Sequence, residues 1–206
     1  FMNTEDFLNT SENFFRKNHQ LIESSFNYDE VDRFIKEGYE IIFCEGYMSK
    51  QNPFFKYLPL NTTKGDVIDI EQNEKKIDCI LNKGVFVLPI KENILRIGAT
   101  YQWNTDDPTP TQKGREELEE KLKVLDQINY KIVQHRAGIR PTVKDRRPLI
   151  GTHPVREKLH IINGMGTRGV ALAPYWIDQF ILSLENRIAL PEEVNIRRFD
   201  NELNVD

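Results

Sequence analysis

The chain has 206 residues and a mass of 24.2 kDa, and its 39% of hydrophobic residues can fill the core of one sizeable domain or of two small lobes. Its 28 Lys and Arg residues and 32 Asp and Glu residues give a formal net charge of −4, which argues against nucleic acid or an anionic membrane surface as a partner. The two cysteines lie in apolar runs without a CxxC spacing, which argues against a disulfide framework and indicates a reducing, cytoplasmic location, and no apolar run reaches the ~20 residues of a membrane span.

Helical patterns come first along the chain. Thr4 can cap a helix over residues 5–18, in which two pairs of large apolar residues recur seven positions apart and share one face. Asn27 begins a capping box and Gly38 suits the position after a helix end, so a short second helix is expected between them. The apolar run Tyr39–Cys44 follows and is typical of a parallel strand that is buried on both faces.

An alternating pattern of apolar and polar residues replaces the helical one from about residue 65. It predicts an antiparallel sheet with strands at Val67–Ile70, Ile77–Ile80, Val85–Ile90 and Leu95–Thr100. Thr109 and Pro110 then have the pattern of a helix cap and first helical position, and the helix is expected to run to about Leu125. Its core-facing residues would be Leu118, Leu122 and Leu125.

Two further strands and a helix complete the expected elements. The strands lie at Tyr130–His135 and Leu159–Ile162, and the final helix begins near Val170. This helix carries an apolar stripe, which predicts packing against the core: Ala173, Trp176, Ile177, Phe180, Ile181 and Leu184.

The most distinctive local pattern is the GxGxxG of residues 164–169, between the last strand and the final helix. A glycine-lined turn lets a ligand approach the backbone, and the helix N-terminus after it offers free N–H groups to an anionic or electron-rich group. The pattern is not an ordinary dinucleotide fingerprint, because no second parallel strand with an acidic residue follows it. A tight turn that begins at Asn163 is the alternative interpretation.

Five basic residues lie within residues 136–147. No aromatic residues interleave with them, so a nucleic-acid patch is not favoured. Arginines at the end of a strand suit a guanidinium fork aimed at a carboxylate or phosphate. Ion pairs with Asp145 are the alternative, more so for Arg146 and Arg147 than for Arg140. The four histidines have neither i,i+4 spacing nor a Cys partner, so no metal site is expected, and no side chain is an evident general base.

Four motifs follow one another in the sequence: Gly98-Ala99-Thr100, Ala137-Gly138-Ile139-Arg140-Pro141, Asp145-x-x-Pro148-Leu149-Ile150-Gly151 and Asn163-Gly164-x-Gly166-x-x-Gly169-Val170. In this order they resemble the C-terminal half of FAD-dependent oxidoreductases of the D-amino-acid oxidase and glycine oxidase type. The likeness extends to Ile42-Phe43-Cys44-Glu45-Gly46, which looks like the late parallel strand of the FAD domain, and to Lys64-Gly65, which would open the substrate-domain sheet.

The resemblance implies an α/β fold, in which a remnant of a parallel FAD-binding domain holds an antiparallel substrate-domain lobe between its pieces. Residues 1–60 would form the helices and late strand of the FAD-binding lobe, residues 61–135 the antiparallel lobe with one helix, and residues 136–206 the C-terminal FAD-binding segment, final helix and tail. The parent protein would oxidise the C–N bond of a small-molecule amine or amino acid by hydride transfer to FAD.

The resemblance also implies site residues. Arg140 would pair with the substrate carboxylate, and Phe86 would line the substrate site at a position where glycine oxidase-like members have a tyrosine, which leaves the amino acid open. The implied cofactor-binding residues are Glu45, Gly46, Gly138, Gly164, Gly166, Thr167, Arg168, Gly169 and Val170. No catalytic side chain and no metal ligand is implied.

The family's N-terminal βαβ unit, whose GxGxxG holds the FAD pyrophosphate, has no counterpart in this sequence, and Phe1 stands before Met2. The chain is therefore expected to be the rear piece of an enzyme, inactive without the missing N-terminal half. The alternatives are a non-catalytic fragment or domain of such an enzyme, a flavin dehydrogenase or tRNA-modifying relative, and an unrelated interaction module that matches the ordered motifs by coincidence. The acidic charge balance weighs against a tRNA substrate.

Overall fold

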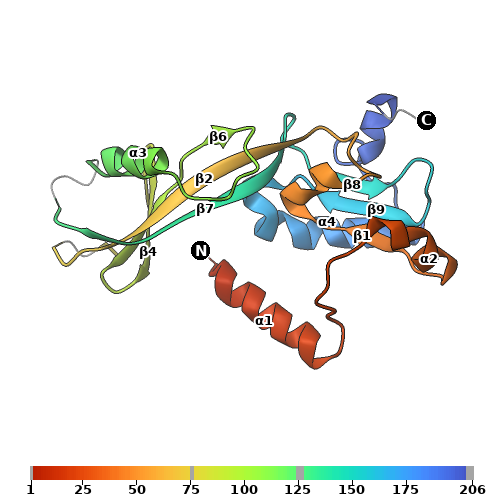
Figure 1. The fold of residues 1–206 in the computed structure, drawn as a ribbon, viewed down its shortest axis with the longest axis horizontal. Coiled ribbons are helices and arrows are strands. Elements are labelled where there is room, and N and C mark those ends of the chain that lie inside the picture. The colour runs from red at the N-terminus through yellow and green to blue at the C-terminus, as the bar shows by residue number, and fades with distance from the viewer. Residues whose placement is uncertain (1, 75–76, 124–127, 203–206) are drawn as a thin grey trace.

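The computed structural model describes residues 2–74, 77–123 and 128–202. Two sheets lie at opposite ends of an elongated molecule (Figure 1). A six-stranded, antiparallel sheet occupies one end and a three-stranded sheet the other, and two long strands, β2 (Leu60–Glu71) and β7 (Lys131–Val143), run from one end toward the other. The predicted α/β fold with an antiparallel lobe is confirmed.

The helices of the N-terminal segment lie where the sequence predicts them. Helix α1 (Thr4–Lys17) is capped by Asn3 and not by Thr4, because the Asn3 side chain accepts hydrogen bonds from the first backbone N–H groups. None of its residues is buried, so its apolar face lies in solvent. Helix α2 (Val31–Lys36) follows a 3₁₀ turn (Tyr28–Glu30), which Asn27 caps, and the helix ends before Gly38, whose φ is +97°.

The large sheet is built around β2. Its neighbours on one edge are β5 (Ile94–Gly98) and the short β6 (Gln102–Trp103), and β4 (Phe86–Lys91) and β3 (Leu81–Asn82) continue the sheet beyond β5. The prediction of a strand at residues 77–80 is wrong. The edge of β4 pairs instead with the two residues of β3 that follow, so residues 77–80 have no strand partner.

Strand β7 is longer than predicted and pairs with β2 from the Leu60–Val143 pair to the Glu71–Lys131 pair. The expected end near residue 135 is wrong, because the glycine and proline that follow are tolerated in a strand with one unpaired edge. Arg136, Gly138 and Arg140 therefore lie in the middle of the strand. These three residues lie on one face of the sheet, and His135 and Ala137 lie on the other.

Helix α3 (Gln112–Leu122) covers one face of the large sheet (Figure 1). The predicted contacts of Leu118 and Leu122 are confirmed, since both pack against the buried residues of β2 and β5, while Leu125 lies outside the described residues. The predicted cap at Thr109 is wrong, and Thr111 caps the helix by accepting a hydrogen bond from Gly114 N at 3.1 Å.

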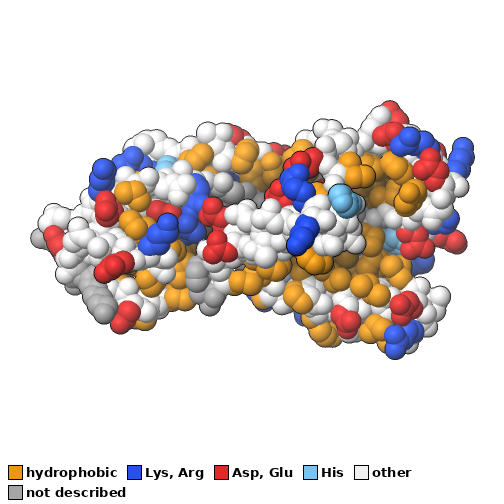
Figure 2. All heavy atoms as spheres, turned by 90° about the horizontal axis from the view of Figure 1, so that it is seen from below, with side chains coloured by type: hydrophobic (Ala, Val, Ile, Leu, Met, Phe, Trp, Pro, Cys, Tyr) orange, Lys and Arg blue, Asp and Glu red, His pale blue; other side chains and the backbone are white. Residues whose placement is uncertain are grey.

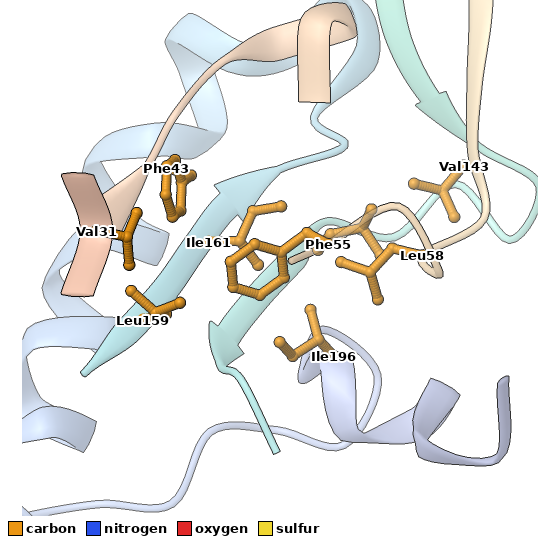
Figure 3. Packing of buried hydrophobic residues seen from close by; sticks show 9 residues of the cluster. Val31, Phe43, Phe55, Leu58, Val143, Leu159, Ile161 and Ile196 are labelled. Atoms are coloured by element: carbon orange, nitrogen blue, oxygen red, sulfur yellow. The ribbon is translucent and has the colours of Figure 1, made fainter. Parts of the chain in front are cut away.

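The small sheet has the order β1 (Ile41–Phe43), β9 (Leu159–Asn163), β8 (Leu149–Thr152). Strands β1 and β9 are parallel, and β8 is an antiparallel strand that the sequence did not reveal. The core of the small sheet consists of residues from β1, β9 and the segment before β2, among them Phe43, Leu159, Ile161, Phe55 and Leu58 (Figure 3).

Helix α4 (Gly169–Leu184) packs on the small sheet through Phe180. The prediction of one buried stripe is only partly right, because Ile177 and Ile181 are exposed, and Ile42 of β1 is exposed as well instead of being buried on both faces. Hydrophobic side chains accordingly gather on the underside of this half of the molecule (Figure 2).

The division of the chain into residues 1–60, 61–135 and 136–206 remains a prediction, and its boundary after residue 135 falls inside β7. No helix within the described ranges combines the length and apolar character that crossing a membrane requires.

Gly114 gives a test of the packing of α3. A Cβ there would come within 2.6 Å of Asp66 Oδ2, and Asp66 is a buried carboxylate that accepts hydrogen bonds from Thr111 N and Thr100 Oγ1. We expect Gly114→Ala to lower the free energy of unfolding by about 1–3 kcal/mol, although Gly to Ala in a helix normally raises it by about 1 kcal/mol.

Gly169→Ala is the matched control in urea unfolding. Gly169, like Gly114, lies in the first turn of a helix, and its φ is −50°. The atom nearest to an added Cβ there is 3.9 Å away. We expect no loss of stability for this variant. Equal stability changes for the two variants would contradict the close packing of α3 on Asp66.

Candidate functional site

The GxGxxG turn joins β9 to α4 in a conformation that requires glycine. Gly164 has φ +74° and Gly166 has φ +56°, both in the left-handed region. A Cβ on Gly164 would lie 2.8 Å from Val143 Cγ2, so the turn packs closely against the end of β7. Neither the 3₁₀ turn at Gly166–Arg168 nor α4 has a side chain as its cap, which leaves backbone N–H groups at the start of α4 available to a ligand.

The Glu45–Gly46 loop lies beside this turn. Parallel strands β1 and β9 end at the same edge of the small sheet, and Asn163 at the end of β9 donates from Nδ2 to the Gly46 carbonyl oxygen at 2.8 Å. Two segments more than 110 residues apart in the sequence are thereby held together. This is the edge of a parallel sheet at which ligands commonly bind.

The Glu45 side chain has a structural role in that loop. Its carboxylate accepts hydrogen bonds from Tyr28 Oη at 2.6 Å, Asn52 Nδ2 at 2.9 Å and Ser49 Oγ at 3.1 Å. Burial, together with the hydrogen bond to Glu45, raises the pKa of Tyr28 to about 12. The Glu45 carboxylate is therefore already engaged, and a contact of Glu45 with a cofactor, which stays a prediction, would have to come from its backbone.

A cavity of about 520 Å³ lies between the glycine turn and the end of the large sheet. Its lining comes from β2, β6 and the residue before it, β7, the segment after β7 and the turn: Asn61, Tyr101, Trp103, Thr142, Val143, Lys144, Arg146, Gly164, Met165, Gly166, Thr167 and Arg168. The lining contains three cationic side chains and no acidic one. The cavity therefore favours an anionic ligand.

Arg140 points across the sheet beside this cavity. Its guanidinium lies directly over Gly65 of β2, where any Cβ would collide with it, and 5.5 Å from the ring centroid of Tyr101. Nη1 of Arg140 is buried and has no hydrogen-bond partner among the described residues. Burial lowers the pKa of Arg140, against a smaller raising effect of Tyr101. A buried guanidinium N–H without an acceptor is costly unless a ligand supplies one.

Arg140 lies on the face of the large sheet opposite to α3, which we call the open face and define by Phe86, Arg96, Arg136 and Arg140. The Phe86 ring covers Gly98, since a Cβ there would be 2.7 Å from Phe86 Cζ. The adjacent strands β2 and β5 thus carry glycines, and the strands that flank this pair, β7 and β4, place larger side chains over them. Gly138 faces open space.

The structure brings most of the predicted residues to one region. Gly164, Gly166, Thr167 and Arg168 line the cavity, Gly169 and Val170 begin α4 directly after it, and Tyr101 connects the cavity to Arg140. Phe86 and Gly138 share the open face with Arg140 but do not line the cavity.

Sequence reasoning missed the aromatic pair Tyr101 and Trp103, whose ring centroids are 5.0 Å apart. Both side chains are more than half exposed, and Tyr101 lies directly before the short strand β6, two residues from Trp103. Two large aromatics at alternating positions in a polar segment were the available signal. Thr142, Lys144 and Arg146 were also missed as lining residues.

Comparison with known proteins agrees with this geometry. Residues 19–176 match the family model of the FAD dependent oxidoreductases. The chain belongs to this family. The resemblance to its glycine oxidase branch is confirmed by the glycine oxidase of Bacillus subtilis (strain 168), which is 32% identical over 128 residues, or 59% of this chain and 35% of the relative.

Two further similar proteins carry names other than glycine oxidase. The tRNA 5-methylaminomethyl-2-thiouridine biosynthesis bifunctional protein MnmC of Idiomarina loihiensis is 24% identical over 147 residues, or 68% of this chain and 24% of the relative. The structure of L-proline dehydrogenase from P. horikoshii has a TM-score of 0.66 and 17% identity, over 79% of this chain and 47% of the other. The chain spans less than half the length of each of these three relatives.

The two positive-φ glycines of the turn predict unequal costs. Gly164→Ala combines a left-handed φ with a 2.8 Å contact to Val143, whereas Gly166→Ala has the left-handed φ but only a 3.6 Å contact to Thr142 Cγ2. We expect Gly166→Ala to lower the free energy of unfolding by about 1 kcal/mol and Gly164→Ala by at least twice as much. Urea unfolding measures both, and a larger loss for Gly166→Ala would contradict the described packing of the turn.

Proposed function

We propose that the protein to which this chain belongs oxidises the C–N bond of an amino acid or related amine with FAD as its cofactor. The observation that carries the proposal is the buried, unpaired Nη1 of Arg140 on the open face, next to the glycine turn. A guanidinium in this state is a ready partner for a substrate carboxylate, which would complete its hydrogen bonds in a site with little water.

The residues of the cavity suit FAD. The glycine turn leaves space near Gly166, where the nearest atom to an added Cβ is 3.6 Å away, and the uncapped start of α4 presents N–H groups and the positive end of a helix dipole. When bound, FAD would accept a hydride from the carbon that carries the amine. The N–H group of Arg168 donates to the Met165 carbonyl oxygen. The other N–H groups from Gly166 to Val170 would stabilise negative charge that develops at the edge of the cofactor nearest to them.

The other residues of the site would orient the substrate. Arg140 would hold the carboxylate, and Phe86, which cannot donate a hydrogen bond, would contribute apolar surface to the open face. No side chain is assigned as a general base, so we propose that the substrate amine is neutral when it reacts.

A second candidate, a tRNA-modifying oxidoreductase, is supported by the similarity to MnmC of Idiomarina loihiensis. The net charge of −4 weighs against it, because RNA binding depends on basic surface. A flavin dehydrogenase uses the same site and differs only in the acceptor that reoxidises the cofactor. We also propose a cytoplasmic location, which the free thiols of Cys44 and Cys79 support.

Arg140→Met tests the carboxylate anchor in the full-length natural protein. We expect kcat/KM for amino acid substrates to fall by a factor equivalent to about 2–4 kcal/mol, because a desolvated charge pair loses one partner. Bound FAD, measured by its absorbance, should change little. Arg147→Met is the matched control, since Arg147 lies outside the cavity and pairs with Glu193 at 3.4 Å. If Arg140→Met left kcat/KM unchanged, Arg140 would not be the anchor.

A further inference from the structure

A second arginine lies on the open face close to Arg140. Arg136 and Arg96 both bind the carboxylate of Asp69, Arg96 through Nε at 2.8 Å and Nη2 at 2.9 Å, and Arg136 through Nη2 at 3.2 Å. Asp69 is buried, and Arg96 is the more buried of the two arginines. The one carboxylate of Asp69 thus accepts hydrogen bonds from two guanidinium groups.

Arg136 keeps most of its hydrogen-bonding capacity. A guanidinium has five N–H donors, and among the described residues Arg136 uses them only toward Asp69. Arg96 is better compensated, because it makes two hydrogen bonds to Asp69 and Glu5 of α1 adds a further attractive charge. The uncompensated positive charge of the cluster therefore belongs mainly to Arg136.

A cavity of about 500 Å³ lies in front of this cluster. Its charged lining residues are Glu5, Asp69, Lys91, Arg96 and Arg136, one more cationic than acidic. This cavity is separate from the one at the glycine turn, and the two have no lining residue in common. Arg140 lies between them along the sheet, because it is four residues from Arg136 on β7.

On β2 the side chain of Val67 lies on the open face between Gly65 and Asp69, but on β7 the position between Arg136 and Arg140 is open. The residue between them on the same face is Gly138, and an added Cβ there would meet no atom within 4 Å. The Cα atoms of residues four apart on one strand are separated by about 13 Å. The guanidinium groups of Arg140 and Arg136 reach Gly65 and Asp69 of β2, which are also four residues apart, so a spacing of the same order separates the two groups. After a hydrogen bond of about 2.8 Å at each end, this distance accommodates a short molecule with an acid group at both ends.

We propose that Arg136 is a second anion-binding residue, which selects substrates with an additional acid group, such as dicarboxylic amino acids or amines. This inference rests on the proposed function in taking Arg140 as the first carboxylate anchor. Asp69 is a positioning residue, since it and Arg96 fix the direction of the Arg136 guanidinium. Glu5 and Asp69 are the acidic groups that a bound anion would have to coexist with.

Binding of two simple acids tests the proposal without turnover. Glutarate and butyrate differ by a second carboxylate, and isothermal titration calorimetry on the full-length natural protein measures both. We expect glutarate to bind at least about tenfold more tightly than butyrate, which corresponds to one additional charge-assisted hydrogen-bonded pair. Equal affinities, or no binding of glutarate, would overturn the proposal.

Two variants assign the preference to its residue. In Arg136→Gln the two acids should bind with equal affinity, and the affinity for butyrate should match that of the unsubstituted protein. In the control Arg147→Gln, outside both cavities, the preference for glutarate should persist. A preference for glutarate that survives in Arg136→Gln, or that disappears in Arg147→Gln, would overturn the role of Arg136.

The same protein separates this inference from the proposed function. Oxidation of a neutral amino acid without any glutarate preference would uphold the proposed function and contradict the second subsite. A glutarate preference that depends on Arg136, in a protein that oxidises no amine, would uphold the subsite and contradict the proposed function.

Discussion

The pairing of β2 with β7 is the constraint on which the arrangement of the site depends. These strands stay paired from the Leu60–Val143 pair to the Glu71–Lys131 pair. The chain enters β2 from the side of the small sheet and returns to that side at the end of β7. Their register places Arg140 opposite Thr63, so that its side chain extends over Gly65. The end of β7 also packs against the glycine turn through Val143. One strand pair therefore sets the position of the arginine relative to the turn.

The two faces of this sheet have different tasks. The face under α3 holds the apolar residues Ile68 and Ile97, which pack with Leu118 of the helix. Asp66 and His135 lie on the same face and are joined by a hydrogen bond at 2.9 Å. The open face carries arginines and glycines, and no helix of the described residues packs on it as α3 packs on the opposite face. The face under α3 thus holds the buried apolar contacts that stabilise the sheet. The open face holds charged groups that do not make all of their possible hydrogen bonds. Such incomplete pairing in a buried position is where a ligand contributes most.

Local patterns predicted the elements whose boundaries are set by their own residues. The Asn27 cap, a parallel strand within residues 39–44 and a helix after the glycine turn follow from spacing and cap chemistry, and all three are present. The length of β7 and the existence of β8 depend on pairing with distant strands, which no local pattern contains. The site followed the same rule. Its glycine turn could be predicted from the local sequence. Tyr101 and Trp103 could not, because the pairing of β6 with β2 is what brings them to the cavity.

The central claim is that Arg140 holds its guanidinium ready for a carboxylate that the protein itself does not provide. A crystal structure of the full-length natural protein with bound butyrate tests this most directly. The account predicts a carboxylate oxygen within about 3 Å of Arg140 Nη1, on the open face between Tyr101 and Gly138. A structure in which Nη1 is paired with an acceptor of the protein, and butyrate binds elsewhere or not at all, would contradict it.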